Sequence, residues 1–245
     1  MKVLKSLFDI KERVAVLSGG GGILAGEMAK GLLDSSAKVI LLDINEENLK
    51  KKVKALKTEE NEIIGYKCDV LNENNLKSVN EKILSKFGKI DILVNAAGGN
   101  MTGATIDIGQ TIFDMKIENF RKVTDLNLIG TVLPTLIFGE DMAKQKTGSI
   151  INISSMASTS VITRVVGYSA AKAAIDNFTK WMAVEMAQKF GDKIRVNAIA
   201  PGFLITEQNR SLLTNEDGSL TDRGNTILKI TPFNRFGEPD ELVGT

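Results

Sequence analysis

The segment Arg13-Val-Ala-Val-Leu-Ser18-Gly19-Gly20-Gly21-Gly22-Ile23-Leu24-Ala25-Gly26 decides the fold class of this chain. It begins with a short apolar run of the kind that forms a buried β-strand. Four glycines follow, and a helical pattern starts at Ile23. Glycines at such a turn let the backbone approach a pyrophosphate, and the N-terminus of the next helix offers it free N–H groups. The order of strand, glycines and helix therefore predicts a phosphate-binding βα unit.

The remainder of the chain continues this alternation. Further strands are predicted at residues 38–43, 62–67, 90–95, 148–154 and 193–199, and helices at 23–33, 46–56, 72–87, 118–144 and 168–190. Continuous apolar strands separated by helices are typical of a parallel sheet that is covered on both faces. We therefore expect an α/β fold with a doubly wound, Rossmann-type parallel sheet. We expect one domain over residues 1–245, with a substrate lid at about residues 203–235.

Composition excludes several classes of function. The chain is 43% hydrophobic and 25% charged, and its net charge of +1 gives no electrostatic reason to expect nucleic acid or an acidic membrane as a partner. It has no histidine and only one cysteine, Cys68, so we expect no metal site of the His/Cys type and no intrachain disulfide. The sequence shows no secretory signal pattern and no apolar run of membrane-spanning length. We expect a cytoplasmic protein.

The most informative catalytic pattern is Tyr168-Ser-Ala-Ala-Lys172, which follows Ser155 by thirteen residues. On a helix, the i,i+4 spacing places the phenol and the ammonium on one face. A phenol titrates near pH ~10, and a nearby cation favours its ionised form. Ser155 can hydrogen-bond the oxygen of a carbonyl or alcohol that Tyr168 protonates or deprotonates. A short Tyr-x-x-x-Lys pattern by itself more often marks a solvated helix face, so this interpretation depends on the other motifs.

Asp43 ends the second predicted strand, where an acidic residue reaches the ribose hydroxyls of a bound adenosine. Its carboxylate would repel a 2′-phosphate, and neither Ile44 nor Asn45 supplies a cation to offset that repulsion. The sequence therefore favours NAD, with NADP the less favoured cofactor. Asp43 could also cap the helix that begins at Glu46.

Four more motifs follow in chain order. Asp69-Val70 comes after the third predicted strand, and Asn95-Ala96-Ala97-Gly98 ends the fourth. Asn127 lies in the sequence Asp-Leu-Asn-Leu-Ile-Gly, and Pro201-Gly202 shortly precedes Thr206. Together with the segments above, these motifs resemble the short-chain dehydrogenase/reductase family, and the resemblance covers nearly the whole chain.

The resemblance implies a role for each motif. Asp69 and Val70 would contact adenine, the turn of residues 95–98 would lie beneath the cofactor, and the turn at Pro201 would flank the nicotinamide. Asn127, Ser155, Tyr168 and Lys172 would be the catalytic residues, with Asn127 holding a water in a proton relay and Lys172 also binding the nicotinamide ribose. A homo-oligomer, a tetramer or a dimer, is implied as well. The expected cofactor-binding residues are Ser18, Gly19, Gly20, Gly21, Gly22, Ile23, Leu24, Asp43, Ile44, Asp69, Val70, Asn95, Ala96, Ala97, Gly98, Tyr168, Lys172, Pro201, Gly202, Phe203, Leu204 and Thr206.

Two features depart from the family pattern. Ser18 replaces the first threonine of Thr-Gly-x-x-x-Gly-x-Gly, and Ile23 and Ala25 replace its last two glycines. The overlapping register Gly20-x-Gly22-x-x-Ala25 satisfies the general dinucleotide fingerprint, so the glycine that contacts the pyrophosphate stays open. Family members also continue beyond a helix like that expected at residues 240–243 into a last strand, which we expect to be missing from this chain.

Within the family, four segments resemble the group labelled D-mannonate oxidoreductase (fructuronate reductase): residues 98–100, 138–142, 201–210 and 212–221. The loop after Gly202 carries side chains that suit hydroxyls and a carboxylate, whereas a steroid or a long acyl chain would favour an apolar lid. Arg210 is the expected carboxylate-binding residue, and Arg164 is its rival. The expected substrate-binding residues are Asn100, Ser155, Met156, Arg164, Gln208, Asn209 and Arg210.

The sequence therefore predicts an NAD(H)-dependent oxidoreductase that transfers a hydride between nicotinamide and a small sugar acid of the D-mannonate/D-fructuronate type. Tyr168 would be the general acid and base. Two alternatives stay open: a dehydrogenase of another polyol or ketose such as gluconate, and a non-catalytic dinucleotide-binding sensor. A sensor has no need of the Asn-Ser-Tyr-Lys set.

Overall fold

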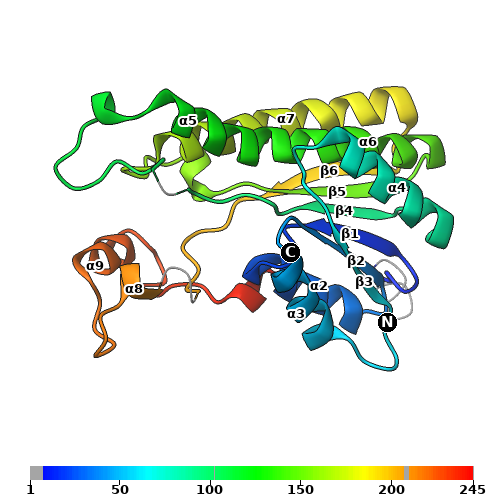
Figure 1. Ribbon diagram of the computed structural model, residues 1–245, viewed down its shortest axis with the longest axis horizontal. Coiled ribbons are helices and arrows are strands. Elements are labelled where there is room, and N and C mark those ends of the chain that lie inside the picture. Colours follow the sequence, from blue (N-terminus) through cyan, green and yellow to red (C-terminus); the bar gives the residue numbers. More distant parts are fainter. Residues whose placement is uncertain (1–7, 102, 207–209, 245) are drawn as a thin grey trace.

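The computed structural model describes residues 8–101, 103–206 and 210–244, and all six of its strands lie in one parallel sheet (Figure 1). The strand order is β3-β2-β1-β4-β5-β6, so the chain reverses its direction of winding between β1 and β4. In such sheets a ligand site lies at the carboxyl ends of the strands beside this reversal. The strands are β1 (Val14–Ser18), β2 (Lys38–Asp43), β3 (Ile63–Lys67), β4 (Ile92–Asn95), β5 (Gly148–Ile153) and β6 (Ile194–Ile199).

Helices cover both faces of the sheet, which confirms the doubly wound prediction. In Figure 1, α2 (Ile23–Asp34) and α3 (Glu46–Leu56) lie on one face, and α4 (Glu73–Phe87), α6 (Gly130–Gln145) and α7 (Val166–Phe190) lie on the other. Successive side chains of β1 alternate between two apolar clusters: Val14 and Val16 belong to one, and Ala15 and Leu17 to the other. The central strand β1 is buried along its whole length and is apolar up to Ser18, whereas three of the six residues of the edge strand β6 are exposed.

The predicted helix at residues 118–144 is wrong as a single element. It is divided into α5 (Ile117–Thr124), a π-helical turn η2 (Asp125–Ile129) and α6, and the 3₁₀ turn η1 (Ile112–Asp114) precedes it. Polar side chains mark the break: Asn127 Nδ2 donates to the Val123 carbonyl at 2.8 Å, and Thr131 Oγ1 donates to the Asn127 carbonyl at 2.9 Å. Such π-helical turns occur frequently at functional sites. The helical pattern of residues 118–144 was visible in the sequence, but the π-helical turn within it was not.

The segment after β6 contains three short elements, of which the sequence predicted only the last. They are α8 (Arg210–Leu213), α9 (Asp222–Lys229) and η4 (Pro239–Leu242), and η4 is a 3₁₀ turn in place of the helix expected at residues 240–243. Figure 1 shows α8 and α9 apart from the sheet, on the side of the long segment that leads from β4 to α5. An isolated β-bridge pairs Leu204, before α8, with Gly237, after α9. In the described ranges no helix is long and apolar enough to cross a membrane.

Candidate active site

A cavity of about 870 Å³ opens at the carboxyl ends of the strands, where the strand order predicts a site. Segments far apart in the sequence line it. They are the glycine turn after β1, the ends of β2 and β5, residues 96–100 after β4, the start of α7, and the chain after β6. The fold therefore brings the predicted cofactor and catalytic motifs to one place.

Two of the four consecutive glycines face this cavity. Gly19 has φ +67°, which favours glycine, and a Cβ there would lie 2.9 Å from the Ala96 carbonyl oxygen. Gly22 is the N-cap of α2 and has no side-chain cap, so the first N–H groups of α2 point to the site without a protein partner at the cap. Gly20 and Gly21 do not line the cavity: a Cβ on Gly20 would lie 2.6 Å from Leu41 Cβ. Gly19 and Gly22 are therefore the glycines placed to approach a phosphate.

Asp43 faces the cavity at the end of β2, with its carboxylate held by the backbone. Oδ2 accepts the N–H of Gly21 at 2.9 Å, and Oδ1 accepts the N–H of Asn45 at 2.8 Å. A carboxylate has further lone pairs, so it can still accept ribose hydroxyls. The suggestion that Asp43 caps the next helix is wrong, because Asn45 is the N-cap of α3 and accepts the N–H of Asn48 at 3.0 Å.

Ser155 and Tyr168 both line the cavity and come from different elements. Ser155 lies two residues after β5 and caps the 3₁₀ turn η3 (Met156–Ser158), where its Oγ accepts the N–H of Ala157 at 3.1 Å. Tyr168 lies in the first turn of α7. Lys172 is one turn later and is only 4% exposed, with its Nζ 5.4 Å from the centroid of the Tyr168 ring. The Nζ donates to the Ile153 carbonyl at 2.6 Å, so Lys172 lies behind the cavity wall.

Burial controls the ionisation of this pair. It raises the pKa of Tyr168 above its ordinary value, and a hydrogen bond with Ser155 lowers that pKa by less. Burial also lowers the pKa of Lys172 to about 8, against a smaller opposing effect from Asp176. The prediction that Tyr168 has a lowered pKa is therefore wrong for this structure, because removal from water has a larger effect than the hydrogen bond with Ser155. Tyr168 is protonated at neutral pH and can act as a proton donor.

Asn127 supports the turn after β4. Its side chain is fully buried, with Oδ1 accepting the N–H of Gly99 at 3.0 Å and Nδ2 donating to the Gly99 carbonyl at 2.8 Å. A Cβ on Gly98 would lie 2.6 Å from Asn127 Oδ1 and 3.6 Å from Lys172 Nζ, so this glycine passes between the two side chains. Asn127 thus positions the cavity wall, and its role in a water relay stays a prediction.

Ser18 and Asn95, both expected to bind the cofactor, are buried beneath the cavity and do not line it. Ser18 Oγ accepts the N–H groups of Ala96 and Ala97, both at 3.1 Å. Asn95 Nδ2 donates to Asn152 Oδ1 at 2.9 Å and to a threonine hydroxyl of α6 at 2.8 Å. Sequence reasoning missed Asn152, although a polar residue inside the apolar run of β5 is a usable signal. These side chains fix the turns that carry the lining residues.

Comparisons with known proteins agree with this geometry. The family model described as short chain dehydrogenase matches residues 13–217. The chain belongs to the short-chain dehydrogenase family. It is 41% identical to an uncharacterised oxidoreductase, UxuB, of Bacillus subtilis strain 168 over 97% of this chain and 87% of that protein. It is 30% identical to the 7α-hydroxysteroid dehydrogenase of Escherichia coli K12 over 94% of this chain and 84% of that protein. A crystal structure of a proposed D-mannonate oxidoreductase from Haemophilus influenzae with bound NAD superposes with a TM-score of 0.91, at 40% identity, over 98% of this chain and 89% of that chain.

As a short-chain dehydrogenase, the protein is an oxidoreductase that acts on a CH–OH group. Most of the residues predicted to bind the cofactor line the cavity. Cys68, missed by the sequence analysis, also lines the cavity, where burial raises the pKa of its thiol to about 12 and keeps it protonated. Other lining residues that the sequence analysis missed are Ala25, Leu42, Leu71, Gly99, Leu126, Ile153, Ser154, Ile162, Val165 and Arg223. The predicted cofactor residues that line the cavity are Gly19, Gly22, Ile23, Leu24, Asp43, Ile44, Asp69, Val70, Ala96, Ala97, Gly98, Tyr168, Pro201, Gly202, Phe203, Leu204 and Thr206.

The predicted substrate residues of this dehydrogenase separate into three groups. Asn100, Ser155 and Met156 line the cavity. Arg164 does not: its Nε donates to the Ile106 carbonyl at 2.6 Å, and its guanidinium pairs with Asp107 at 3.3 Å. Arg210 is exposed at the start of α8 and does not line the cavity either. Gln208 and Asn209 lie outside the described residues. The cation that the structure brings to the cavity is Arg223, on a helix that the sequence analysis did not predict.

Proposed function

We propose that this protein is an NAD(H)-dependent oxidoreductase of a sugar acid, interconverting a keto acid of the D-fructuronate type and a hydroxy acid of the D-mannonate type. The observation that carries the proposal is the likeness to the Haemophilus structure, which spans almost the whole chain at 40% identity. Asn100, Ser155 and Tyr168 place polar groups in a cavity whose lining is otherwise largely apolar, and they can bind the hydroxyls of a sugar.

The residues of the cavity fit NAD. Gly19, Gly22 and the N-terminus of α2 offer close approach and N–H groups to a pyrophosphate. Asp43 can accept the hydroxyls of the adenosine ribose, and Ile44 beside it adds no cation for a 2′-phosphate. At the other end, Tyr168 lines the part of the cavity that would hold the nicotinamide ribose, and Lys172 lies behind it. When bound, NADH supplies the hydride, and the protein supplies position and a proton.

The chain's own residues perform the proton transfer. Ser155 and Tyr168 are neighbouring lining residues and would both donate to the ketone oxygen, so its developing negative charge would meet two hydroxyl donors. Tyr168, whose pKa is raised, gives its proton to that oxygen, and in the oxidative direction the ionised Tyr168 accepts one from the alcohol. Below pH ~8 Lys172 is charged, and its position beside the ring then stabilises the ionised phenol.

The substrate is tested by following NADH oxidation with D-fructuronate, with the neutral ketose D-fructose, and with a 7-oxo bile acid. We expect D-fructuronate to give the highest kcat/KM and a product that co-elutes with D-mannonate. A higher kcat/KM with the bile acid would replace the sugar-acid proposal with a steroid one. NADH binding without turnover on any ketone would support the sensor alternative.

Cofactor preference gives a separate prediction. The double variant Asp43→Ala, Ile44→Arg should lose its preference for NADH over NADPH or reverse it, because attraction for the 2′-phosphate replaces repulsion. Dissociation constants for both reduced cofactors, measured by fluorescence titration, check this. Ile44→Ala alone is the control, since it changes no charge. Tighter binding of NADPH than NADH by the unaltered protein would contradict the role given to Asp43.

The oligomeric state implied by the family resemblance stays a proposal. Helices α6 and α7 leave Leu136, Trp181 and Val184 exposed to 54%, 60% and 56%. Large apolar side chains grouped on neighbouring helices are typical of an association surface, which supports a homo-oligomer.

A further inference from the structure

Arg223 lines the catalytic cavity from α9. It is half-buried, and within the described residues it forms no ion pair. Two other arginines, Arg164 and Arg235, are paired with carboxylates. Arg164 pairs with Asp107, and Arg235 forms two bonds to Glu241 at 2.7 and 2.8 Å. A guanidinium that lines the cavity with its donors unpaired can bind an anionic group of a ligand through charge-assisted hydrogen bonds.

The local structure fixes where Arg223 lies. It is in the first turn of α9, whose N-cap Thr221 accepts the N–H of Gly224 at 3.1 Å. Gly224 packs against the Leu213 carbonyl, and Ile227 is buried, so the side of α9 that carries these two residues faces α8. A cation in the first turn is unfavourable for the helix dipole, which gives no structural reason for an arginine here.

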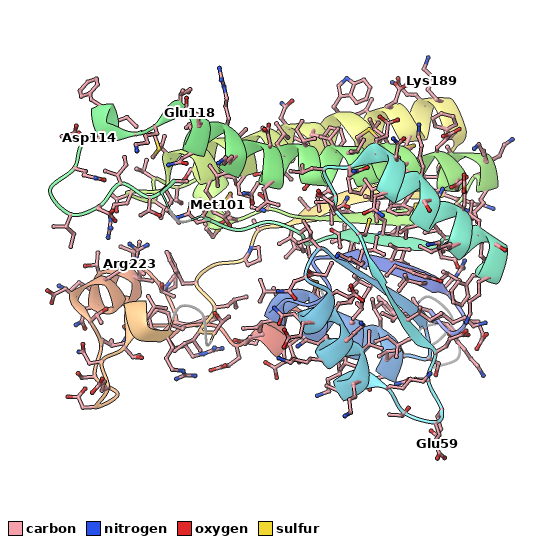
Figure 2. The ribbon with its side chains drawn as sticks, in the orientation of Figure 1. Glu59, Met101, Asp114, Glu118, Lys189 and Arg223 are labelled. Atoms are coloured by element: carbon pink, nitrogen blue, oxygen red, sulfur yellow. The ribbon has the colours of Figure 1, made fainter. Side chains whose placement is uncertain are left out.

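Two carboxylates, Asp43 and Asp69, line the same cavity as Arg223. Asp43 and Asp69 line the part expected to hold adenosine, and the N-terminus of α2 is the expected pyrophosphate site. In Figure 1, α9 lies away from α2 and α3, below the segment between β4 and α5. Figure 2 shows Arg223 on the side of α9 that lies toward Met101. The neighbour of Met101, Asn100, lines the same cavity.

We propose that Arg223 is the residue that binds the carboxylate of the substrate and so selects a keto acid over a neutral ketose. This inference rests on the proposed sugar-acid function. A guanidinium meets a carboxylate through two parallel hydrogen bonds, and the geometry differs from that of a lysine ammonium. With the ketone oxygen held by Ser155 and Tyr168, Arg223 on α9 would hold the far end of the substrate.

The test compares Arg223→Gln with a matched control, Arg210→Gln. Both changes remove one positive charge from the segment after β6, but Arg210 is exposed and does not line the cavity. Steady-state kinetics are measured with D-fructuronate and with D-fructose, which has a CH₂OH group in place of the carboxylate. We expect Arg223→Gln to lower kcat/KM for D-fructuronate by at least about tenfold, as for loss of a charge-assisted bond, and to change kcat/KM for D-fructose by less than about threefold. Arg210→Gln should change neither by more than about threefold.

Binding gives a second measurement that needs no turnover. Calorimetric titration of D-mannonate into each protein saturated with NAD should show weaker binding for Arg223→Gln only, and Arg223→Lys should recover part of it. Equal losses of kcat/KM for D-fructuronate and for D-fructose would show that Arg223 is structural and would overturn the inference. An unchanged D-fructuronate value in Arg223→Gln would overturn it too.

The same experiment separates the two proposals. If the unaltered protein reduces other keto acids and not D-fructuronate, the proposed substrate is wrong, and the Arg223 comparison is decided on those keto acids against their neutral analogues. If Arg223→Gln lowers kcat/KM for those keto acids and not for their neutral analogues, the inference holds without the D-fructuronate assignment. If the protein reduces no keto acid at all, both proposals are overturned.

Discussion

Tyr168→Phe should reduce turnover by at least about 100-fold, the typical loss when general acid–base catalysis is removed. Phenylalanine keeps the aromatic ring packed at the start of α7 and removes only the oxygen that exchanges the proton. Single-turnover oxidation of bound NADH measures the step directly, because it excludes product release.

Two controls accompany this variant. NADH affinity should change by less than about threefold, and the melting temperature should be unchanged or slightly higher, since a buried hydroxyl is lost. Turnover within threefold of the unaltered protein would remove Tyr168 from the mechanism. A large loss of NADH affinity would instead show that the hydroxyl binds cofactor.

Lys172→Met should separate activity from stability. Lys172 is 4% exposed, and burial lowers its pKa from 10.5 to about 8. Its buried charge therefore destabilises the folded protein at neutral pH. Methionine fills a similar volume without charge. We expect turnover to fall at least about 100-fold, while the free energy of unfolding at pH 7 rises by roughly 1–3 kcal/mol after the loss of the bond to Ile153.

The difference in unfolding free energy between Lys172→Met and the unaltered protein should become smaller as the pH rises. Below pH ~8 Lys172 is protonated in the folded and unfolded states, and its destabilising effect is fully present. Between about pH 8 and 10.5 the unfolded state binds more protons than the folded state, so the stability of the unaltered protein rises relative to Lys172→Met. Urea unfolding at several pH values should therefore show the gap closing by pH ~10. A gap that does not change between pH 7 and 10 would mean that the pKa of Lys172 is not lowered. Lys180→Met, an exposed lysine of the same helix, is the control.

Local patterns were sufficient for the sheet and for part of the site. The strands were predicted to within two residues because short apolar runs mark the strands of a sheet that helices cover on both faces. The glycine turn was recognised because a strand, a tight turn and a helix each leave a mark within a few residues. Tyr168 and Lys172 could be assigned to one helix face because i,i+4 neighbours meet in any helix.

Sequence alone determined the order of strands and helices, the glycine turn and the Tyr168–Lys172 pair, since each depends on residues that are close in the chain. Only the tertiary structure decided which arginine reaches the cavity: Arg164 is held by Ile106 and Asp107, Arg210 is exposed, and Arg223 lines the site. That choice depends on how α8 and α9 pack through Gly224 and on the bridge from Leu204 to Gly237, contacts between distant residues. The pKa values of Tyr168 and Lys172 were decided there too, because removal from water is a property of the packed fold and not of the spacing between two side chains.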